Sequence, residues 1–340
     1  MKTVPVDQAV GMVLPHDITV IIKDVKKGTA FRKGHIIEAS DVEPLKKLGK
    51  DNIYVLSLTE NEIHENEAAI LLAEGLAGSG VVYSKEAEEG KIALIAEHDG
   101  LLKVNKRALL DFNMLGEVMC STLHNNTPVK KGEVVAGTRL IPLIAERRLI
   151  ESAVSLTRVP GSIISVTQLS KKKIGLVITG SEVFYGRIED RFEEVLRAKA
   201  DDYGSIIHQV HKAPDDKNLI AKKIIECIDA GCDLIITSGG MSVDPDDVTR
   251  EAIIEAGATT SVYGTPVLPG AMFLSGTIGD VSVLGLPACG MFHKITVFDL
   301  VFPRILIGES IGRKELAELG HGGLCRNCKV CQYPICNFGK

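Results

Sequence analysis

The chain of 340 residues has no tryptophan, and aromatic residues make up only 4% of it. Proteins that bind single-stranded nucleic acid stack bases on exposed aromatic rings, so this composition argues against that class of protein. The formal net charge of −5 at pH 7 also argues against a broad basic surface for nucleic acid. A local basic pocket for one small anion is still compatible with that charge.

Long uncharged apolar segments are missing as well. Residues 1–7 lack the apolar core of a signal peptide. No apolar run reaches the roughly 18 residues that a membrane-spanning helix needs. We therefore expect a cytoplasmic protein without a membrane partner. Its length and its hydrophobic fraction of 45% suit two or three globular domains.

The second half of the chain alternates apolar, strand-like runs with helical patterns. Strands are expected at 174–178, 206–210, 234–237 and 281–284, and helices at 190–202, 215–230, 247–256 and 292–306. This alternation predicts an α/β fold, a three-layer αβα domain with a mostly parallel sheet. Residues 272–274 could add a strand that runs against the others.

The first half shows short apolar bursts broken by Lys-Gly pairs, which is typical of short strands. We expect a smaller β-rich (α+β) domain there, with a strand–turn–strand at 27–37, a strand at 53–56, and helices at 60–76 and 143–154. Ser40 and Glu43 predict a capped helix that Gly49 ends. The predicted domains are 1–168, 169–312 and a cysteine-rich tail at 313–340.

The loop after the strand at 234–237 carries the strongest signal for a binding site within the domains. Thr-Ser-Gly-Gly at 237–240 offers backbone N–H groups and hydroxyls at the end of a strand, which suit an oxyanion. Asp244, Asp246 and Asp247 follow, and carboxylates suit a hard cation such as Mg²⁺ that bridges to a phosphate. The simpler alternative is a tight turn in which one Asp caps the next helix.

A second glycine loop, at 179–182, follows the strand at 174–178, and Asp190 stands near the next helix start. Loops that follow parallel strands share one edge of the sheet, where ligands of such folds bind. Pro269-Gly270 and Leu286-Pro287 are expected at the same edge, although ordinary turn chemistry explains them equally well. Helix capping alone also explains Asp190.

Four of the eight cysteines form a compact motif near the end of the chain, C-x2-C-x2-C-x4-C, made of Cys325, Cys328, Cys331 and Cys336. In a cytosolic chain such spacing indicates a metal more often than disulfides. Four thiolates complete a tetrahedral Zn²⁺ shell or hold a [4Fe–4S] cluster, and the spacing differs by one residue from a ferredoxin run. The alternative is a flexible, redox-sensitive thiol tail. The other cysteines lie in apolar contexts and suit small buried side chains.

Residues 173–308 resemble the molybdopterin-binding domain of molybdenum-cofactor biosynthesis proteins. That group includes molybdopterin molybdenumtransferases, the C-terminal part of gephyrin and molybdopterin adenylyltransferases. Residues 237–243 followed by Asp247 are similar to T-S-G-G-V-S-V-G-x-x-D, and residues 179–182 to T-G-D/S-E-L. Pro269-Gly270 and Leu286-Pro287 stand where the transferases have P-G-K-P and L-P-G-N-P. Residues 1–58 and 127–150 resemble the N-terminal region of the transferases loosely.

The chain departs from that family pattern in three places. Gly270 is followed by Ala271-Met272 in place of Lys-Pro, so a basic anchor is missing. Leu286-Pro287 is followed by Ala288-Cys289-Gly290 in place of Gly-Asn-Pro. No Asp-Gly-Tyr-Ala segment occurs in the first domain, and the cysteine tail is an addition to the family plan.

The resemblance implies a set of site residues. Pterin binding is implied for two glycine loops and two turns, formed by Thr179, Gly180, Ser181, Glu182, Thr237, Ser238, Gly239, Gly240, Met241, Ser242, Pro269, Gly270 and Pro287. Asp190 and Asp247 are the implied catalytic residues. With Asp246 they are also the implied Mg²⁺ ligands.

The implied function is molybdenum-cofactor biosynthesis by a molybdenumtransferase-like enzyme. Its cofactors would be molybdopterin and Mg²⁺. It would bind adenylylated molybdopterin and insert molybdate. The relatives also imply a homo-oligomer. An alternative is a non-catalytic cofactor carrier or sensor, whose metal-bearing tail docks to a molybdoenzyme or another cofactor-assembly protein. A third reading is another phosphate-handling enzyme, such as a nucleotide pyrophosphatase.

Overall fold

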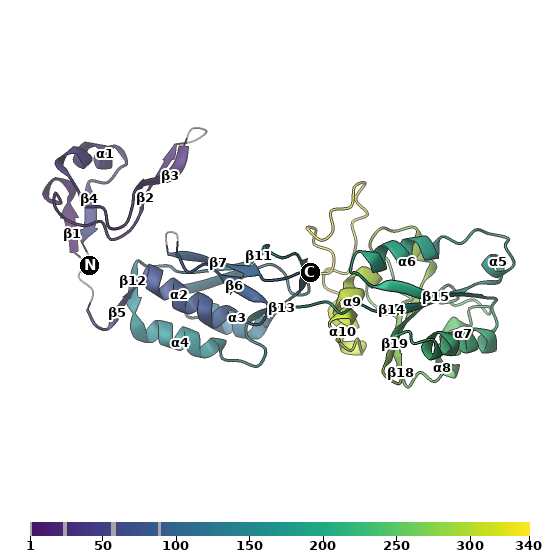
Figure 1. The fold of residues 1–340 in the computed structure, drawn as a ribbon. Coiled ribbons are helices and arrows are strands. Elements are labelled where there is room, and N and C mark those ends of the chain that lie inside the picture. The colour runs from purple at the N-terminus through teal and green to yellow at the C-terminus, as the bar shows by residue number, and fades with distance from the viewer. Residues whose placement is uncertain (1, 23–25, 56–58, 88–89) are drawn as a thin grey trace. The chain divides into compact units, whose positions relative to one another are not determined.

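In the computed structural model the described residues are 2–22, 26–55, 59–87 and 90–340. The chain divides into two compact units. The first comprises residues 1–97, 104–123 and 131–165, and the second comprises residues 98–103, 124–130 and 166–340. Figure 1 shows both as ribbons. Among the described residues, no helix is long and apolar enough to cross a bilayer.

The second unit is built on a six-stranded sheet with the order β15-β14-β16-β19-β18-β17 (Figure 1). Its strands are β14 (Lys173–Thr179), β15 (Ile206–Ala213), β16 (Leu234–Ser238), β17 (Thr260–Tyr263), β18 (Leu274–Ile278) and β19 (Val281–Leu286). The first four strands in this spatial order are parallel, and β18 and β17 are antiparallel to their neighbours. This topology confirms the predicted α/β class with a mostly parallel sheet.

Helices cover both faces of this sheet (Figure 1). On one face lie α6 (Phe192–Asp201) and α9 (Val297–Leu306), and on the other lie α7 (Lys217–Asp229) and α8 (Thr249–Glu255). Leu176 of β14 belongs to the core under α6 and α9, whereas Val177 belongs to the core under α7 and α8. Successive side chains of a strand point to opposite faces of the sheet. Because both faces of this sheet are buried, its central strands appear in the sequence as continuous apolar runs.

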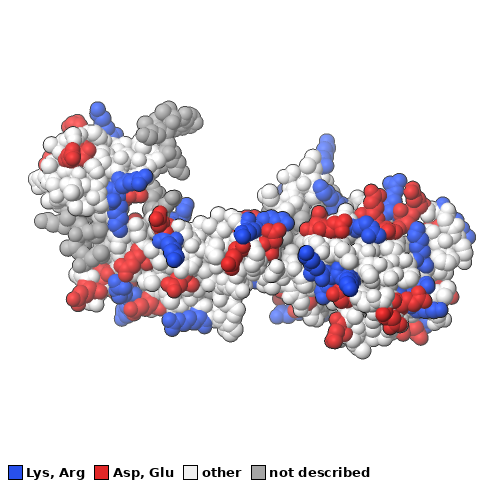
Figure 2. All heavy atoms as spheres, in the orientation of Figure 1, with Lys and Arg blue, Asp and Glu red and all other residues white. Residues whose placement is uncertain are grey.

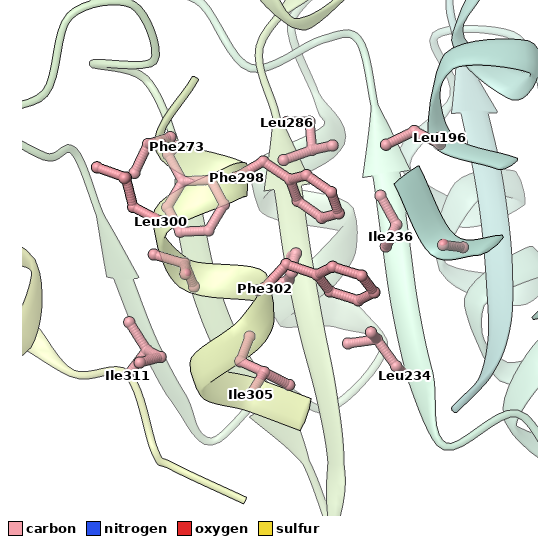
Figure 3. Packing of buried hydrophobic residues seen from close by; sticks show 14 of the residues in the cluster. Leu196, Leu234, Ile236, Phe273, Leu286, Phe298, Leu300, Phe302, Ile305 and Ile311 are labelled. Carbon is pink, nitrogen blue, oxygen red and sulfur yellow. The ribbon is translucent and has the colours of Figure 1, made fainter. Parts of the chain in front are cut away.

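The core between the sheet and α9 is rich in phenylalanine. Figure 3 shows Phe298 and Phe302 projecting from α9 toward Ile236 of β16. Their rings are stacked with centroids 4.8 Å apart, and both side chains are buried. Burying one such side chain contributes about 1.5–3 kcal/mol, so these residues fix α9 on the sheet.

The second unit also contains the short helices α5 (Ser181–Phe184) and α10 (Arg313–Glu318) and the 3-10 turn η3 (Ala288–Met291). The helix predicted at 292–306 is wrong at its start, because α9 begins only at Val297. Thr296 and Asp299 form a capping box, in which Asp299 accepts the Thr296 N–H at 2.7 Å. The strand predicted at 272–274 begins at Leu274 and is antiparallel, as expected.

A partly buried ion pair follows α9. Arg304 Nε donates to Glu309 at 2.6 Å, Lys103 Nζ donates to the other carboxylate oxygen, and Lys103 also reaches Asn126. Burial acts against the charged form of Glu309, but the hydrogen bonds from Lys103 and Arg304 outweigh it and lower its pKa. Glu309 therefore stabilises this unit as a carboxylate.

The first unit is β-rich, as predicted, and also contains helices. Its strands are β1 (Lys2–Pro5), β2 (Ile18–Ile22), β3 (Lys26–Phe31), β4 (Asn52–Val55), β5 (Glu62–His64), β6 (Val81–Tyr83), β7 (Lys91–Ala96), β9 (Val118–Thr122), β11 (Val134–Leu140) and β12 (Ile144–Glu146). They form sheets with the orders β1-β4, β2-β3, β12-β5 and β6-β7-β11-β9. The longer helices are α2 (Glu65–Leu76), α3 (Lys106–Asn113) and α4 (Arg147–Thr157). Most residues of a further sheet, β10-β8-β13, belong to the second unit; its strands are β8 (Gly100–Val104), β10 (Pro128–Val129) and β13 (Ile164–Thr167).

Several predictions for the first half need correction. The strand–turn–strand at 27–37 is wrong, because β3 pairs with the preceding β2, and the connection at 23–25 lies outside the described residues. The helices predicted at 60–76 and 143–154 both begin later, since β5 and β12 precede them and pair with each other. Backbone pairing between distant segments overrides the local helical pattern here.

The predicted helix after Ser40 has a different start. The helix α1 (Val42–Lys47) follows a 3-10 turn, η2 (Ala39–Asp41), whose capping box joins Glu38 and Asp41. The Asp41 carboxylate accepts the Glu38 N–H at 2.8 Å, so Ser40 is not the N-cap. Gly49 ends the helix at a φ of +74°, as expected. Leu56, predicted in the following strand, lies outside the described residues.

Candidate functional site

Three loops come together at the carboxyl edge of the parallel strands. The register pairs Ile178 of β14 with Ser238 of β16, and Ser238 with Leu286 of β19. The segments that follow these residues therefore leave the sheet side by side. This is the edge at which such folds bind ligands.

The turn after β16 requires glycine at two positions. Gly239 has a φ of +92°, and a Cβ there would lie 2.4 Å from the carbonyl oxygen of Thr179. Gly240 has a φ of +55°, and its Cβ would lie 2.4 Å from the Thr249 hydroxyl. The Gly239 N–H donates to the Leu286 carbonyl at 3.2 Å. The turn is thus pressed against both neighbouring strands, which only glycine permits.

Buried hydroxyl groups support this turn from behind. The Thr179 hydroxyl donates to the Ser238 carbonyl at 3.0 Å and lies 2.8 Å from the Thr249 hydroxyl. The Thr237 hydroxyl donates to the Leu284 carbonyl at 3.3 Å. Ser238 Oγ is buried and finds no hydrogen-bond partner among the described residues. The hydroxyl groups of Thr179 and Thr237 therefore support the turn, whereas the buried hydroxyl of Ser238 has no hydrogen-bond partner among the described residues.

A cavity of about 420 Å³ opens at this edge. It is lined by residues of the loop after β16, the loop before β18 and the loop after β19. They are Gly240, Met241, Ser242, Asp247, Leu268, Pro269, Gly270, Ala271, Met272, Pro287, Ala288 and Cys289. The structure thus brings predicted residues from three separate segments together. Sequence reasoning missed Leu268, Ala271, Met272, Ala288 and Cys289 as lining residues, although their neighbours in the two Pro-containing turns marked the place.

Met241 anchors the loop on the domain. Its side chain is only 2% exposed, and a Cβ on Gly285 would lie 2.6 Å from its methyl group. The Tyr263 hydroxyl donates to the Met241 carbonyl at 2.6 Å, and Arg250 lies 5.0 Å above the Tyr263 ring. Sequence reasoning missed Tyr263, because its hydroxyl meets a residue 22 positions away.

The three carboxylates of the loop have different environments. Asp247 lines the cavity, is half-buried, and accepts the Asp244 N–H at 3.1 Å. Asp244 and Asp246 are exposed and do not line it. Neither Asp246 nor Asp247 caps α8, whose N-cap position is Val248 without a side-chain bond. Capping therefore does not account for these carboxylates.

The second glycine loop lies beside the cavity and contributes none of its lining residues. The Ser181 N–H donates to Asp215 at 2.8 Å, so Asp215 holds the start of α5. This residue follows β15, and sequence reasoning missed it. Gly180 has a φ of +133°, and Glu182 is exposed. Asp190 accepts the Phe192 N–H at 2.9 Å just before α6, whose N-cap position is Arg191 without a side-chain bond.

The cavity carries little charge. Among the described residues that line it, Asp247 is the only charged side chain, and Ala271 and Met272 stand where the family pattern has a basic residue. Burial raises the pKa of the Cys289 thiol, which keeps that wall of the cavity neutral. Elsewhere on this unit, Lys and Arg side chains alternate with Asp and Glu on the face that Figure 2 shows.

The four cysteines of the tail line a second cavity, of about 510 Å³, in the same unit. Within the described ranges, no three or more His, Cys, Asp or Glu side chains are placed so that they could hold one metal ion. All eight cysteines are free thiols.

Comparison with known families assigns the class of this domain. Residues 175–306 match the family model described as a probable molybdopterin binding domain. Residues 3–57 match a model described only as a domain of unknown function. The second unit therefore carries a domain that is similar to this molybdopterin-binding family.

Two relatives illustrate the sequence similarity. A molybdopterin molybdenumtransferase of Haemophilus influenzae is 26% identical over 246 residues, which are 68% of this chain and 56% of that protein. A CinA-like protein of Fervidobacterium nodosum is 35% identical over 82 residues, 24% of this chain and 20% of that protein. The chain thus spans about half the length of the first relative and a fifth of the second.

Solved structures similar to this chain cover about two fifths of it. The CinA protein of Thermoplasma acidophilum aligns with a TM-score of 0.36 and 16% identity over 40% of this chain and 98% of that one. The molybdopterin biosynthesis enzyme MoaB of Thermus thermophilus aligns with a TM-score of 0.35 and 22% identity over 41% and 98%.

Proposed function

We propose that the second unit binds molybdopterin or its adenylylated form and that the protein takes part in molybdenum-cofactor biosynthesis. The observation that carries this proposal is the cavity of about 420 Å³ in which the Gly240–Ser242 turn meets the two Pro-containing turns. Its volume is within the range of small-molecule sites. The family model that matches residues 175–306 supports the ligand class.

Phosphate recognition rests on the backbone and on hydroxyl groups. Because the cavity walls carry no basic side chain among the described residues, the phosphate charge has to be offset in another way. The glycine turn and the exposed Ser242 supply N–H and O–H donors. Donors of this kind at the end of a parallel strand stabilise an oxyanion without a lysine or arginine.

A magnesium ion fits this arrangement through one carboxylate. Mg²⁺ usually keeps several waters and binds one or two carboxylates together with substrate phosphates. Asp247 is the predicted ligand that lines the cavity, whereas Asp190 and Asp246 do not. Asp247 would therefore hold Mg²⁺ with the phosphate of the pterin. The ion would neutralise that phosphate and polarise a phosphoanhydride in the adenylylated form.

Two roles in cofactor assembly are compatible with such a site. The similarity to a molybdenumtransferase favours insertion of molybdate. A carrier or sensor role is favoured by Asp190, whose carboxylate is engaged by the Phe192 N–H and does not line the cavity. Molybdate, a molybdoenzyme or assembly-protein partner, a homo-oligomer and a cytoplasmic location stay predictions from the sequence.

Anaerobic titration of the purified chain with molybdopterin and with adenylylated molybdopterin, with and without Mg²⁺, tests the proposal. We expect saturable binding that simple nucleotides do not displace. Turnover of the adenylylated form with molybdate would assign the transferase role, and tight binding without turnover would assign the carrier role. Hydrolysis of simple nucleotides without pterin binding would contradict the proposal.

A further inference from the structure

The cysteine tail is a structured segment that closes around its own cavity. Residues 319–340 are all described and form no further helix or strand after α10. In Figure 1 they are the yellow coil at the C-terminal end. The cavity of about 510 Å³ is lined by all four cysteines of the motif. Ten residues lie between the first and the last of them, so one short loop supplies all four cysteines.

Both ends of the loop are fixed on the domain. At its start, the Cys325 N–H donates to the Leu268 carbonyl and the Leu268 N–H to the Gly323 carbonyl, each at 2.8 Å. At its end, Phe338 is buried in the main core, and the Gly339 N–H donates to the Gly322 carbonyl at 3.0 Å. The cysteines are therefore held in a preorganised loop, which argues against a flexible thiol tail.

These four thiols differ from the cysteines of the cores. Cys120 and Cys227 are buried among apolar side chains, and desolvation raises the pKa of each thiol to about 12. Cys328 is exposed, and Cys325, Cys331 and Cys336 are partly exposed on the cavity wall. Cys120 and Cys227 act as small apolar residues, whereas all four tail cysteines line one cavity, with Cys325 and Cys336 also packed against the main core.

The surroundings suit an anion made of several thiolates. The cavity is lined by the basic side chains of Lys294, Arg326 and Lys329, with His293 beside them. Among the described lining residues there is no Asp or Glu. Metal–thiolate centres with four cysteine ligands are anionic, so this charge distribution favours one in the cavity.

The spacing of the ligands separates a single ion from a cluster. A Zn²⁺ ion with Zn–S bonds of about 2.3 Å draws four sulfur atoms to within about 4 Å of one another. Among the described residues no three such ligands converge on one point, although all four cysteines are among the residues that line one cavity of about 510 Å³. A four-iron cluster carries its own iron and sulfide atoms between the thiolates, so it joins cysteines that stand further apart than those around one Zn²⁺ ion.

We infer that Cys325, Cys328, Cys331 and Cys336 hold a [4Fe–4S] cluster, each thiolate binding one iron. This inference does not depend on the proposed pterin binding. The cluster site adjoins the candidate pterin site, because Leu268 lines the pterin cavity and its backbone pairs with the start of the tail loop. The segment 287–295 likewise contributes Pro287 to one cavity and Phe292–Ile295 to the other.

The test is metal and sulfide analysis of the full chain purified anaerobically and reconstituted with ferrous iron and sulfide, without pterin. We expect about four iron and four acid-labile sulfide per chain, with the visible absorption and electron paramagnetic resonance of such a cluster after reduction. C328S should lose most of this iron, because the exposed thiol is a ligand whose removal leaves core packing intact. C120S, at a thiol outside the tail, should keep it.

Thermal unfolding of C328S without metal, compared with that of the metal-free parent, shows whether the variant is folded. Equal iron and sulfide in C328S and the parent would overturn the inference. One zinc per chain without sulfide, when iron and zinc are offered together, would overturn it too. Absence of any bound metal under these conditions would have the same consequence.

Discussion

The turn at Gly239 allows a sharp test of the site, the substitution G239A. Alanine at a φ of +92° adopts a backbone conformation that costs about 1–2 kcal/mol. Its Cβ would also lie 2.4 Å from the Thr179 carbonyl oxygen, about 1 Å closer than an ordinary contact. The loop must therefore move by about that distance, and such overpacking costs a further 1–3 kcal/mol or so.

Gly257 offers a matched control. Its φ of +99° is similar, but the nearest atom to an added Cβ is 4.0 Å away. G257A should therefore show the conformational cost alone, about 1–2 kcal/mol. The two variants should differ by about 1–3 kcal/mol in the free energy of unfolding of the second unit, measured by calorimetry.

The pterin affinity of the same two variants tests whether the turn contacts the ligand. A displacement of about 1 Å in the turn that meets the phosphate should weaken pterin binding by tenfold or more, about 1.4 kcal/mol, in G239A. G257A should bind like the parent. If folded G239A binds pterin within about threefold of G257A, which is about 0.7 kcal/mol, the turn does not contact the ligand and the reasoning is refuted.

Three further predictions concern single side chains of the same unit. D247N keeps an oxygen that accepts the Asp244 amide but removes the charge, so the Mg²⁺-dependent gain in pterin affinity should fall about tenfold. D246N, at an exposed carboxylate, should keep that gain. Equal Mg²⁺-dependent gains in titrations of the two variants would exclude Asp247 as the Mg²⁺ ligand. D215A removes the acceptor of the Ser181 amide at the start of α5, in a loop that does not line the cavity, so it should lower the free energy of unfolding by about 1 kcal/mol, measured by calorimetry, and leave pterin binding unchanged. D216A removes the cap of α7, which costs about 1 kcal/mol of stability, and should leave pterin binding unchanged. E309Q should lower the free energy of unfolding by about 2 kcal/mol at pH 7. Because the folded pKa of Glu309 is depressed, its contribution is present above about pH 4.5 and disappears as the pH falls through the folded pKa. A difference between E309Q and the parent that stays constant on acidification to about pH 3 would contradict this ion pair.

Much of the second unit could be predicted from local patterns. Residues 174–178 and 234–237 are apolar without interruption because both faces of β14 and β16 are buried. Parallel strands place their loops at one edge, so the glycine turn at 237–240 could be located from the sequence alone. The start of α9 was missed, although Thr296 and Asp299 have the spacing of a capping box.

Other features depend on contacts that no local pattern encodes. Asp215 meets Ser181 across 34 positions of the chain, and Tyr263 meets Met241 across 22. Asp190 carries the same local signal whether it holds the chain before a helix or lines a site, and only the fold shows that it accepts the Phe192 N–H and does not line the cavity. In the first half, short strands pair over long distances, so helical periodicity misplaced the starts of α2 and α4.

The most direct test of the central claim is the amount of pterin that the full chain retains. The chain would be purified anaerobically from a molybdopterin-producing host, and its bound pterin oxidised and quantified beside a family member known to retain it. We predict close to one pterin per chain in the parent and a large loss in G239A. A parent without pterin, under conditions in which that family member keeps its own, would contradict it.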